Sequence, residues 1–144
     1  MFKEHSESGE PINIPINFNH YTFVRTIGRG NYSVVILVAH STTNQLCACK
    51  VITRAGLQTD GAMKRFIQEI DNLQAIDHPN IIKILEIIYT EKNIYIITEY
   101  CPNGELLDYV VNHPKMTRDS IQKLFFQIVS AIFFLHQKKI AHRD

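Results

Sequence analysis

The stretch "TIGRGNYSVVILVAH", residues 26–40, decides the fold. Two glycines stand one residue apart, directly before a run of aliphatic residues. Such glycines can serve a tight hairpin turn, or they can let the backbone lie close over a phosphate. A dinucleotide-binding loop would need a helix directly after the glycines and an acidic residue about 20 positions further on. A strand-like run and Lys50 occupy those places instead.

The surrounding residues predict a sheet with one inserted helix. Short β-branched and aromatic runs separated by turn residues indicate five antiparallel strands. From Asp60, a plausible N-cap, apolar residues recur every three or four positions, which predicts an amphipathic helix. The expected strands are "HYTFVRTIG" (20–28), "VVILVAHS" (34–41), "QLCACKVIT" (45–53), "IIKILEIIYT" (81–90) and "NIYIITEY" (93–100), and the helix carries Met63, Phe66, Ile67, Ile70 and Leu73.

The character of the chain changes after Tyr100. "CPNG" reads as a connector, "ELLDYVVNH" (105–113) as a short helix, and "TRDSIQKLFFQIVSAIFFLHQKK" (117–139) as a long helix capped by Thr117. The fold class is therefore α+β, a sheet-rich lobe followed by the beginning of a helical one. Residues 1–18 are polar with two prolines and read as a flexible leader.

Composition excludes several classes of protein. Fifteen basic and fourteen acidic side chains leave a net charge of +1, so nothing suggests nucleic acid or an anionic membrane as partner. No signal peptide or membrane-spanning run is expected. Three cysteines, an odd number, suit reduced thiols, and we expect a cytoplasmic protein. The "CAC" pair at 47–49 lacks a second Cys/His pair at ligand spacing, so no metal site is predicted.

Lys50 is the first candidate site residue. Strand side chains alternate, so Ala48 and Lys50 share one face and the two flanking cysteines take the other. A small residue beside a lysine leaves room for an adenine and places an ammonium by its phosphates. Glu69 on the expected helix would hold that ammonium ionised. The alternatives are a surface lysine at a strand end and a solvent-side ion pair of Glu69 with Arg65.

These motifs together resemble the eukaryotic protein kinase family, from about Tyr21 to the last residue. "IGRGNYSVV" resembles the glycine-rich loop, "ACK" the third-strand lysine motif and "EI" at 69–70 the αC glutamate. "HPNII", "ITEYCPNGELLDYV" and "LHQKKIAHRD" resemble the following loop, the hinge with the first large-lobe helix, and the approach to the catalytic loop. The stretch "FFQIVSAIFFLH" is most similar to serine/threonine kinases of the calcium/calmodulin- or AMP-dependent type.

The resemblance implies a role for each matched residue. Lys50 would contact the α- and β-phosphates of ATP and pair with Glu69, and Asp144 would accept the proton of the substrate hydroxyl. Thr98 would be the gatekeeper, and Glu105 would reach the ribose. The remaining nucleotide contacts would come from Ile27, Gly28, Gly30, Ser33, Val35, Ala48, and the backbone of Glu99 and Cys101. Ser33 stands where the family most often has a third glycine.

The resemblance also implies a division of the chain and its limits. It gives a flexible leader (1–18), a kinase small lobe (19–98), a hinge (99–104) and the start of an incomplete large lobe (105–144). The magnesium ligands of the family lie past Asp144, so we expect the chain as given not to phosphorylate a protein efficiently. The alternative function is a non-catalytic nucleotide-binding or regulatory module that docks a kinase large lobe or a regulatory protein.

Overall fold

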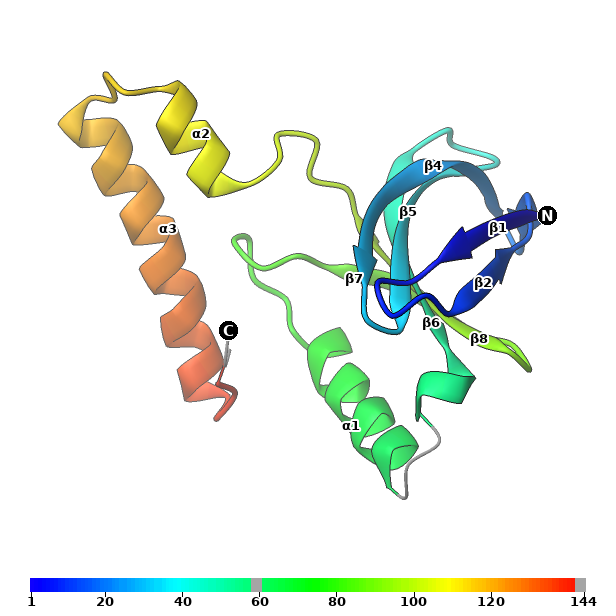
Figure 1. Cartoon of the computed structure of the whole chain (residues 1–144). Helices are drawn as coiled ribbons and strands as arrows, with labels where there is room; N and C mark the ends of the chain where they lie inside the picture. The colour runs from blue at the N-terminus through cyan, green and yellow to red at the C-terminus, as the bar shows by residue number, and fades with distance from the viewer. Residues whose placement is uncertain (58–60, 142–144) are drawn as a thin grey trace. The chain divides into compact units, whose positions relative to one another are not determined.

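The computed structural model describes residues 1–57 and 61–141; side chains at 56, 62, 65, 69, 71 and 72 also lie outside the description. The chain forms two compact units (Figure 1). The first contains Met1–Ala75 and Lys83–Tyr100, and the second contains Ile76–Ile82 and the described residues from Cys101 onward. None of the helices in the described ranges is long and apolar enough to cross a membrane.

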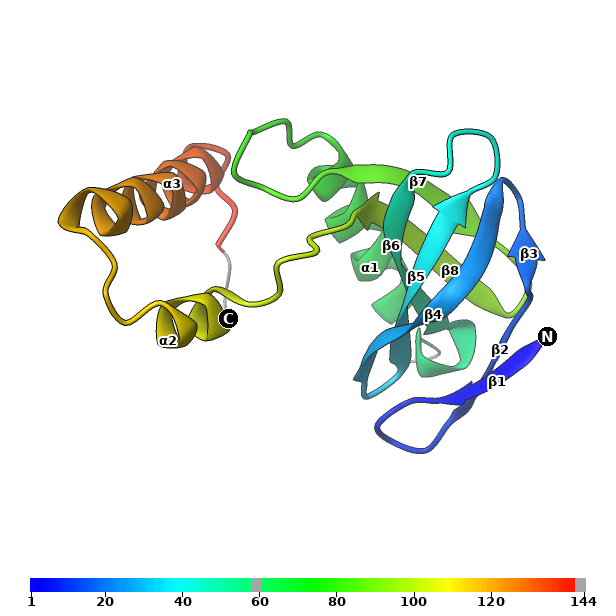
Figure 2. The same ribbon diagram turned by 90° about the horizontal axis from the view of Figure 1, so that it is seen from above.

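The first unit is built on a six-stranded antiparallel sheet, which Figure 2 shows from above. The strand order is β3-β4-β5-β6-β8-β7. The five expected strands are present, and a two-residue strand, β3, adds a sixth at one edge because Ile16 accepts a bond from Phe23 N at 2.8 Å. The bounds are β3 Asn17–Phe18, β4 Tyr21–Gly30, β5 Ser33–His40, β6 Leu46–Thr53, β7 Ile84–Tyr89 and β8 Asn93–Glu99.

The core lies on one face of this sheet. Along β6 the burial alternates, with Cys47 and Cys49 at 2% and 0% exposure while Lys50 is exposed. The same alternation carries aliphatic residues of β5 into the main core cluster. The opposite face is also buried in part, at Leu37, Ile52 and Ile94. The cluster comprises Ile12, Ile14, Tyr21, Val34, Ile36, Val38, Cys47, Cys49, Val51, Tyr95 and Ile97.

The prediction of a flexible leader over residues 1–18 is wrong. Strands β1 (Phe2–His5) and β2 (Pro11–Ile14) form an antiparallel hairpin. Ile12 and Ile14 are 1% and 0% exposed and belong to the core cluster. Burying two isoleucines stabilises the fold by roughly 1.5–3 kcal/mol each. Pro11 is tolerated because it is the first residue of its strand.

The inserted helix is α1, Ala62–Gln74, after a 3₁₀ turn, η1, at Arg54–Leu57. Its N-cap is Gly61, at φ 77°, a backbone region that suits glycine; the expected cap, Asp60, lies outside the described residues. The apolar stripe is narrower than predicted. Ile70 is buried at 3% exposure, whereas Ile67 and Leu73 are 37% and 38% exposed.

The second unit contains the two expected helices, α2 (Leu106–Asn112) and α3 (Arg118–Gln137). Thr117 caps α3 as predicted, since its Oγ1 accepts a hydrogen bond from Ser120 N at 3.2 Å. Within this unit His78 contacts α3, with Nε2 3.1 Å from Ser130 Oγ and its ring 5.1 Å from that of Phe134. Only Leu135 of α3 is buried among the described residues. Leu124 and Phe134 are half-buried. The remaining large apolar side chains of α3 are exposed, and these are Ile121, Phe125, Phe126, Ile128, Val129, Ile132 and Phe133.

Candidate functional site

The glycine loop joins β4 to β5, as the sequence predicts. Gly30 pairs with Ser33 across the turn. A Cβ on Gly30 would lie 2.8 Å from Ser33 Oγ, which is closer than real Cβ atoms approach, so a side chain at position 30 would force the Ser33 hydroxyl to move. A Cβ on Gly28 would meet Val35 Cβ at 3.5 Å, an ordinary contact. Neither loop glycine has a positive φ, so the space available to a side chain, and not backbone conformation, distinguishes Gly30 from Gly28.

A row of residues crosses four strands on the face opposite the core. Gly28 of β4 lies opposite Val35 of β5, Val35 lies opposite Lys50 of β6, and Lys50 lies opposite Ile96 of β8. Val35 and Ile96 are half-buried and Lys50 is exposed. The structure thus brings a glycine, two apolar side chains and an ammonium onto one face.

The next row on this face contains Ala48 and Thr98, which lie directly opposite each other on β6 and β8. Both are half-buried. Thr98 Oγ1 donates to the carbonyl oxygen of Glu99 at 3.1 Å. A carbonyl oxygen has two lone pairs, so this bond leaves the Glu99 carbonyl able to accept another.

A bulge places Ile27 outside this register. Thr26 lies opposite Ile36 and Gly28 opposite Val35, so Ile27 has no partner across the strand pair. A bulge of this kind bends a strand and re-aims its side chains. The sequence analysis does not predict this bulge, because it depends on the register between β4 and β5.

Of the connector residues, Glu99 makes contacts within the first unit, whereas Cys101 and Glu105 belong to the second unit. Glu99 N donates to Lys83 O at 3.2 Å, and Glu99 Oε1 accepts from Lys83 N at 2.6 Å. Both contacts lie within the first unit. Cys101 and Glu105 belong to the second unit, where both are exposed and Glu105 is the N-cap residue of α2.

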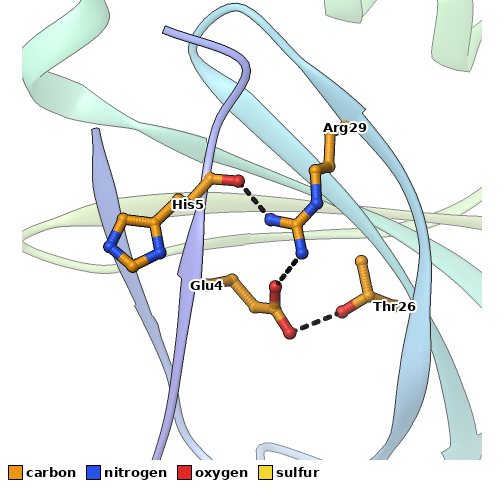
Figure 3. A network of polar contacts seen from close by, with 4 residues as sticks. All are labelled: Glu4, His5, Thr26 and Arg29. Atoms are coloured by element: carbon orange, nitrogen blue, oxygen red, sulfur yellow. Dashed lines mark hydrogen bonds and ion pairs between the residues drawn. The ribbon is translucent and has the colours of Figure 1, made fainter. Parts of the chain in front are cut away.

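A polar network at the glycine loop was missed by the sequence analysis (Figure 3). Arg29, between the two loop glycines, forms an ion pair with Glu4 of β1 at 2.6 Å and donates to the carbonyl oxygen of His5. Glu4 also accepts from Thr26 Oγ1 at 2.8 Å. The contact depends on the position of the β1–β2 hairpin, which the local sequence pattern does not predict.

Burial governs the titration of the core groups. It raises the pKa of the Cys47 and Cys49 thiols, so these cysteines remain neutral at physiological pH. It also raises the pKa of Tyr21 from 10.0 to about 12, aided by the nearby carboxylate of Glu86. All three cysteines are free thiols, and Cys101 alone is exposed.

Comparison with known proteins shows which family the chain belongs to. The model of the protein kinase domain matches residues 21–144. The chain belongs to the protein kinase family. It is also 37% identical, over 125 residues, to a protein of Danio rerio described as a serine/threonine-protein kinase SIK3 homolog. The alignment covers 87% of this chain and 10% of that relative's length.

The family resemblance and the α+β fold class inferred from the motifs are thus confirmed. The matched region of this kinase chain begins at Tyr21, so the β1–β2 hairpin precedes it. The roles of the individual site residues stay predictions. Glu69 is on α1, but its side chain lies outside the description, as do all of His142, Arg143 and Asp144.

Proposed function

We propose that this chain is the ATP-binding portion of a serine/threonine protein kinase. The complete enzyme would transfer the γ-phosphate of ATP to a hydroxyl of a protein substrate. The observation that carries the proposal is the row Gly28–Val35–Lys50, which joins the glycine loop to an ammonium on the half-exposed face of the sheet.

The residues of this face fit an adenine nucleotide. Val35 and Ala48 offer a half-buried apolar surface for a flat base, and Ala48 is small enough to leave space above the sheet. Thr98 lies opposite Ala48 and would be the gatekeeper. Lys50, one row toward the glycine loop, would place its Nζ by the α- and β-phosphates. Ile27, Gly30 and Ser33 would complete the lid above them.

The proposed connector and catalytic roles follow the family pattern. The Glu99 carbonyl and the Cys101 N–H would bond the adenine edge, and Glu105 would bond the ribose. Glu69 would orient Lys50, and Asp144 would accept the proton of the substrate hydroxyl. Magnesium, when bound, would neutralise charge between the phosphates. A reducing compartment such as the cytoplasm is supported by the three free thiols.

Calorimetric titration of the full chain with MgATP and with adenosine tests the proposal. We expect saturable binding of ATP, and we expect Lys50→Met to weaken it about tenfold or more, the loss for a charge-assisted hydrogen bond of about 1.5–3 kcal/mol. Adenosine carries no phosphate, so its affinity should be unchanged. The control is Lys92→Met, which removes the same charge from the exposed β7–β8 turn. Equal affinity of the Lys50→Met and Lys92→Met proteins for ATP would refute the proposal.

A further inference from the structure

The turn of the β1–β2 hairpin is bonded to the tip of the glycine loop. Glu7 N donates to the carbonyl oxygen of Gly30 at 2.9 Å, and Ser8 N donates to that of Asn31 at 3.4 Å. Ser8 Oγ also donates to the Asn31 carbonyl. These contacts join residues 23 positions apart in the sequence, so they are tertiary contacts and not part of a local turn.

The side-chain network in Figure 3 joins the same two segments beside these contacts, between β1 and the end of β4. Arg29 is bonded to the carboxylate of Glu4 and to the carbonyl oxygen of His5. Thr26 Oγ1 donates to the second oxygen of Glu4 at 2.8 Å. Glu4 is 18% exposed in its side chain, against 45% for Arg29, so the partly shielded carboxylate is the anchor of the pair.

Strand β2 and the adjoining turn residue Glu10 fix the hairpin to the body of the first unit. Ile12 and Ile14 lie in the core. Glu10 accepts from Thr53 Oγ1 at 3.2 Å, and the carbonyl oxygen of Asn13 accepts from Asn93 Nδ2 at 3.3 Å. The hairpin therefore connects the buried centre of the first unit to the glycine loop.

The direction of these bonds matters for the loop donors. All peptide bonds among the described residues are trans, so the carbonyl of Gly30 and the N–H of Asn31 point in opposite directions. The hairpin holds the Gly30 carbonyl, which turns the Asn31 N–H away from the hairpin. The same holds for the carbonyl of Asn31 and the N–H of Tyr32.

We propose that the β1–β2 hairpin is a strap that positions the glycine loop for phosphate binding, with Glu4 as a positioning residue that acts through Arg29. This inference rests on the function proposed above. The strap holds loop carbonyls and leaves the N–H groups directed away from it, ready for an anionic ligand. A loop ordered in advance loses less conformational entropy on binding, which raises affinity for the phosphates.

Hydrogen exchange of the full chain without nucleotide tests the anchoring. Glu4→Ala should speed exchange in peptides covering residues 29–33 about three- to tenfold, as expected for loss of the Arg29 and Thr26 bonds. Glu7→Ala is the matched control, since it removes the same charge from the same hairpin and its side chain makes none of these bonds. Ser8→Ala removes the bonds of Ser8 Oγ to the Asn31 carbonyl and to Ser6 Oγ but no charge, and it should give a smaller change in the same direction, which keeps the test valid if Glu4→Ala fails to fold.

Two outcomes would overturn the strap. Exchange at residues 29–33 could match that of the Glu7→Ala protein, or it could rise equally in the peptides of β5 and β6, which would mean that Glu4 only stabilises the whole unit. Titration with ATP and with adenosine gives the second readout. Glu4→Ala should weaken ATP binding about threefold or more and leave adenosine binding unchanged. If the unmodified chain binds neither ligand, the proposed function fails, and the exchange experiment still decides the anchoring.

Discussion

Ala48 and Thr98 lie directly opposite each other on β6 and β8, one row away from Lys50. Both side chains are small and half-buried, so they leave a shallow surface on the sheet beside the Lys50 ammonium. We propose that each row binds a different part of the nucleotide. Ala48 and Thr98 would receive the base, and Lys50 would receive the phosphates.

A larger side chain at position 48 would fill the space proposed for the base. Ala48→Leu should weaken the binding of ATP and of adenosine alike, by about tenfold, because the added methylene groups occupy the place of the base. The midpoint of thermal unfolding shows whether the Ala48→Leu protein keeps its fold, since Ala48 lies opposite the buried Leu37. Ala39→Leu on β5, at another half-buried position, is the control and should leave both affinities unchanged. Unaltered nucleotide affinity in the Ala48→Leu protein would argue against this placement of the base.

Burial of the β1–β2 hairpin should contribute to the stability of the first unit. Ile14→Ala should lower the free energy of unfolding by about 2–5 kcal/mol, because Ile14 is fully buried. Ile16→Ala is the matched control two residues on; Ile16 is 48% exposed, and its replacement should cost less than about 1 kcal/mol. Urea denaturation measures both values. Equal, small effects would restore the view of residues 1–18 as a flexible leader.

This segment shows where sequence reasoning failed and why. Pro11, Pro15 and the polar residues of the first ten positions indicated disorder. The alternation of Ile12, Ile14 and Ile16 is a strand signal, but a four-residue strand has too few residues to outweigh two prolines. Its burial depends on a tertiary contact with the sheet, which local pattern does not contain.

The candidate site was more predictable. The alternation of faces placed Ala48 and Lys50 opposite the two cysteines, because a strand has a side-chain period of two. The helix at Ala62–Gln74 followed from its apolar spacing. The Ile27 bulge and the Glu4–Arg29 pair were beyond the sequence, since both depend on register and on the position of the hairpin.

The three thiols should differ in reactivity. Cys101 is exposed, whereas Cys47 and Cys49 are buried and burial raises their pKa values. We expect one thiol per native chain to react rapidly with iodoacetamide at pH 8, and three to react in denaturant. Peptide mapping by mass spectrometry should assign the fast thiol to Cys101. Labelling of Cys47 or Cys49 at the same rate would contradict the buried face of β6.

Alkaline pH should destabilise the first unit through Tyr21. Burial raises the pKa of Tyr21 to about 12 in the folded chain, against 10.0 for an ordinary tyrosine. Above about pH 10 the unfolded chain therefore loses this proton first, and the free energy of unfolding falls as the pH rises toward 12. The total effect is at most about 2–3 kcal/mol.

The variant Tyr21→Phe isolates this effect. Urea denaturation at a series of pH values should show a weaker fall in stability between pH 10 and 12 for Tyr21→Phe than for the unmodified chain. Tyr32→Phe replaces a phenol that is 52% exposed and serves as the control. A pH dependence identical in the Tyr21→Phe and unmodified proteins would show that the phenol of Tyr21 titrates in the same way in the folded and unfolded chains.

Covalent labelling with an acyl phosphate of ATP tests the central claim most directly. In this reagent a lysine amine attacks the acyl carbon, an amide forms and ATP leaves, so the label marks lysines beside the bound phosphates. The account predicts that Lys50 is acylated fastest of all the lysines, and that free ATP suppresses its labelling while exposed Lys3 and Lys92 are unaffected. Labelling of Lys50 at the rate of those two lysines, with no protection by ATP, would contradict it.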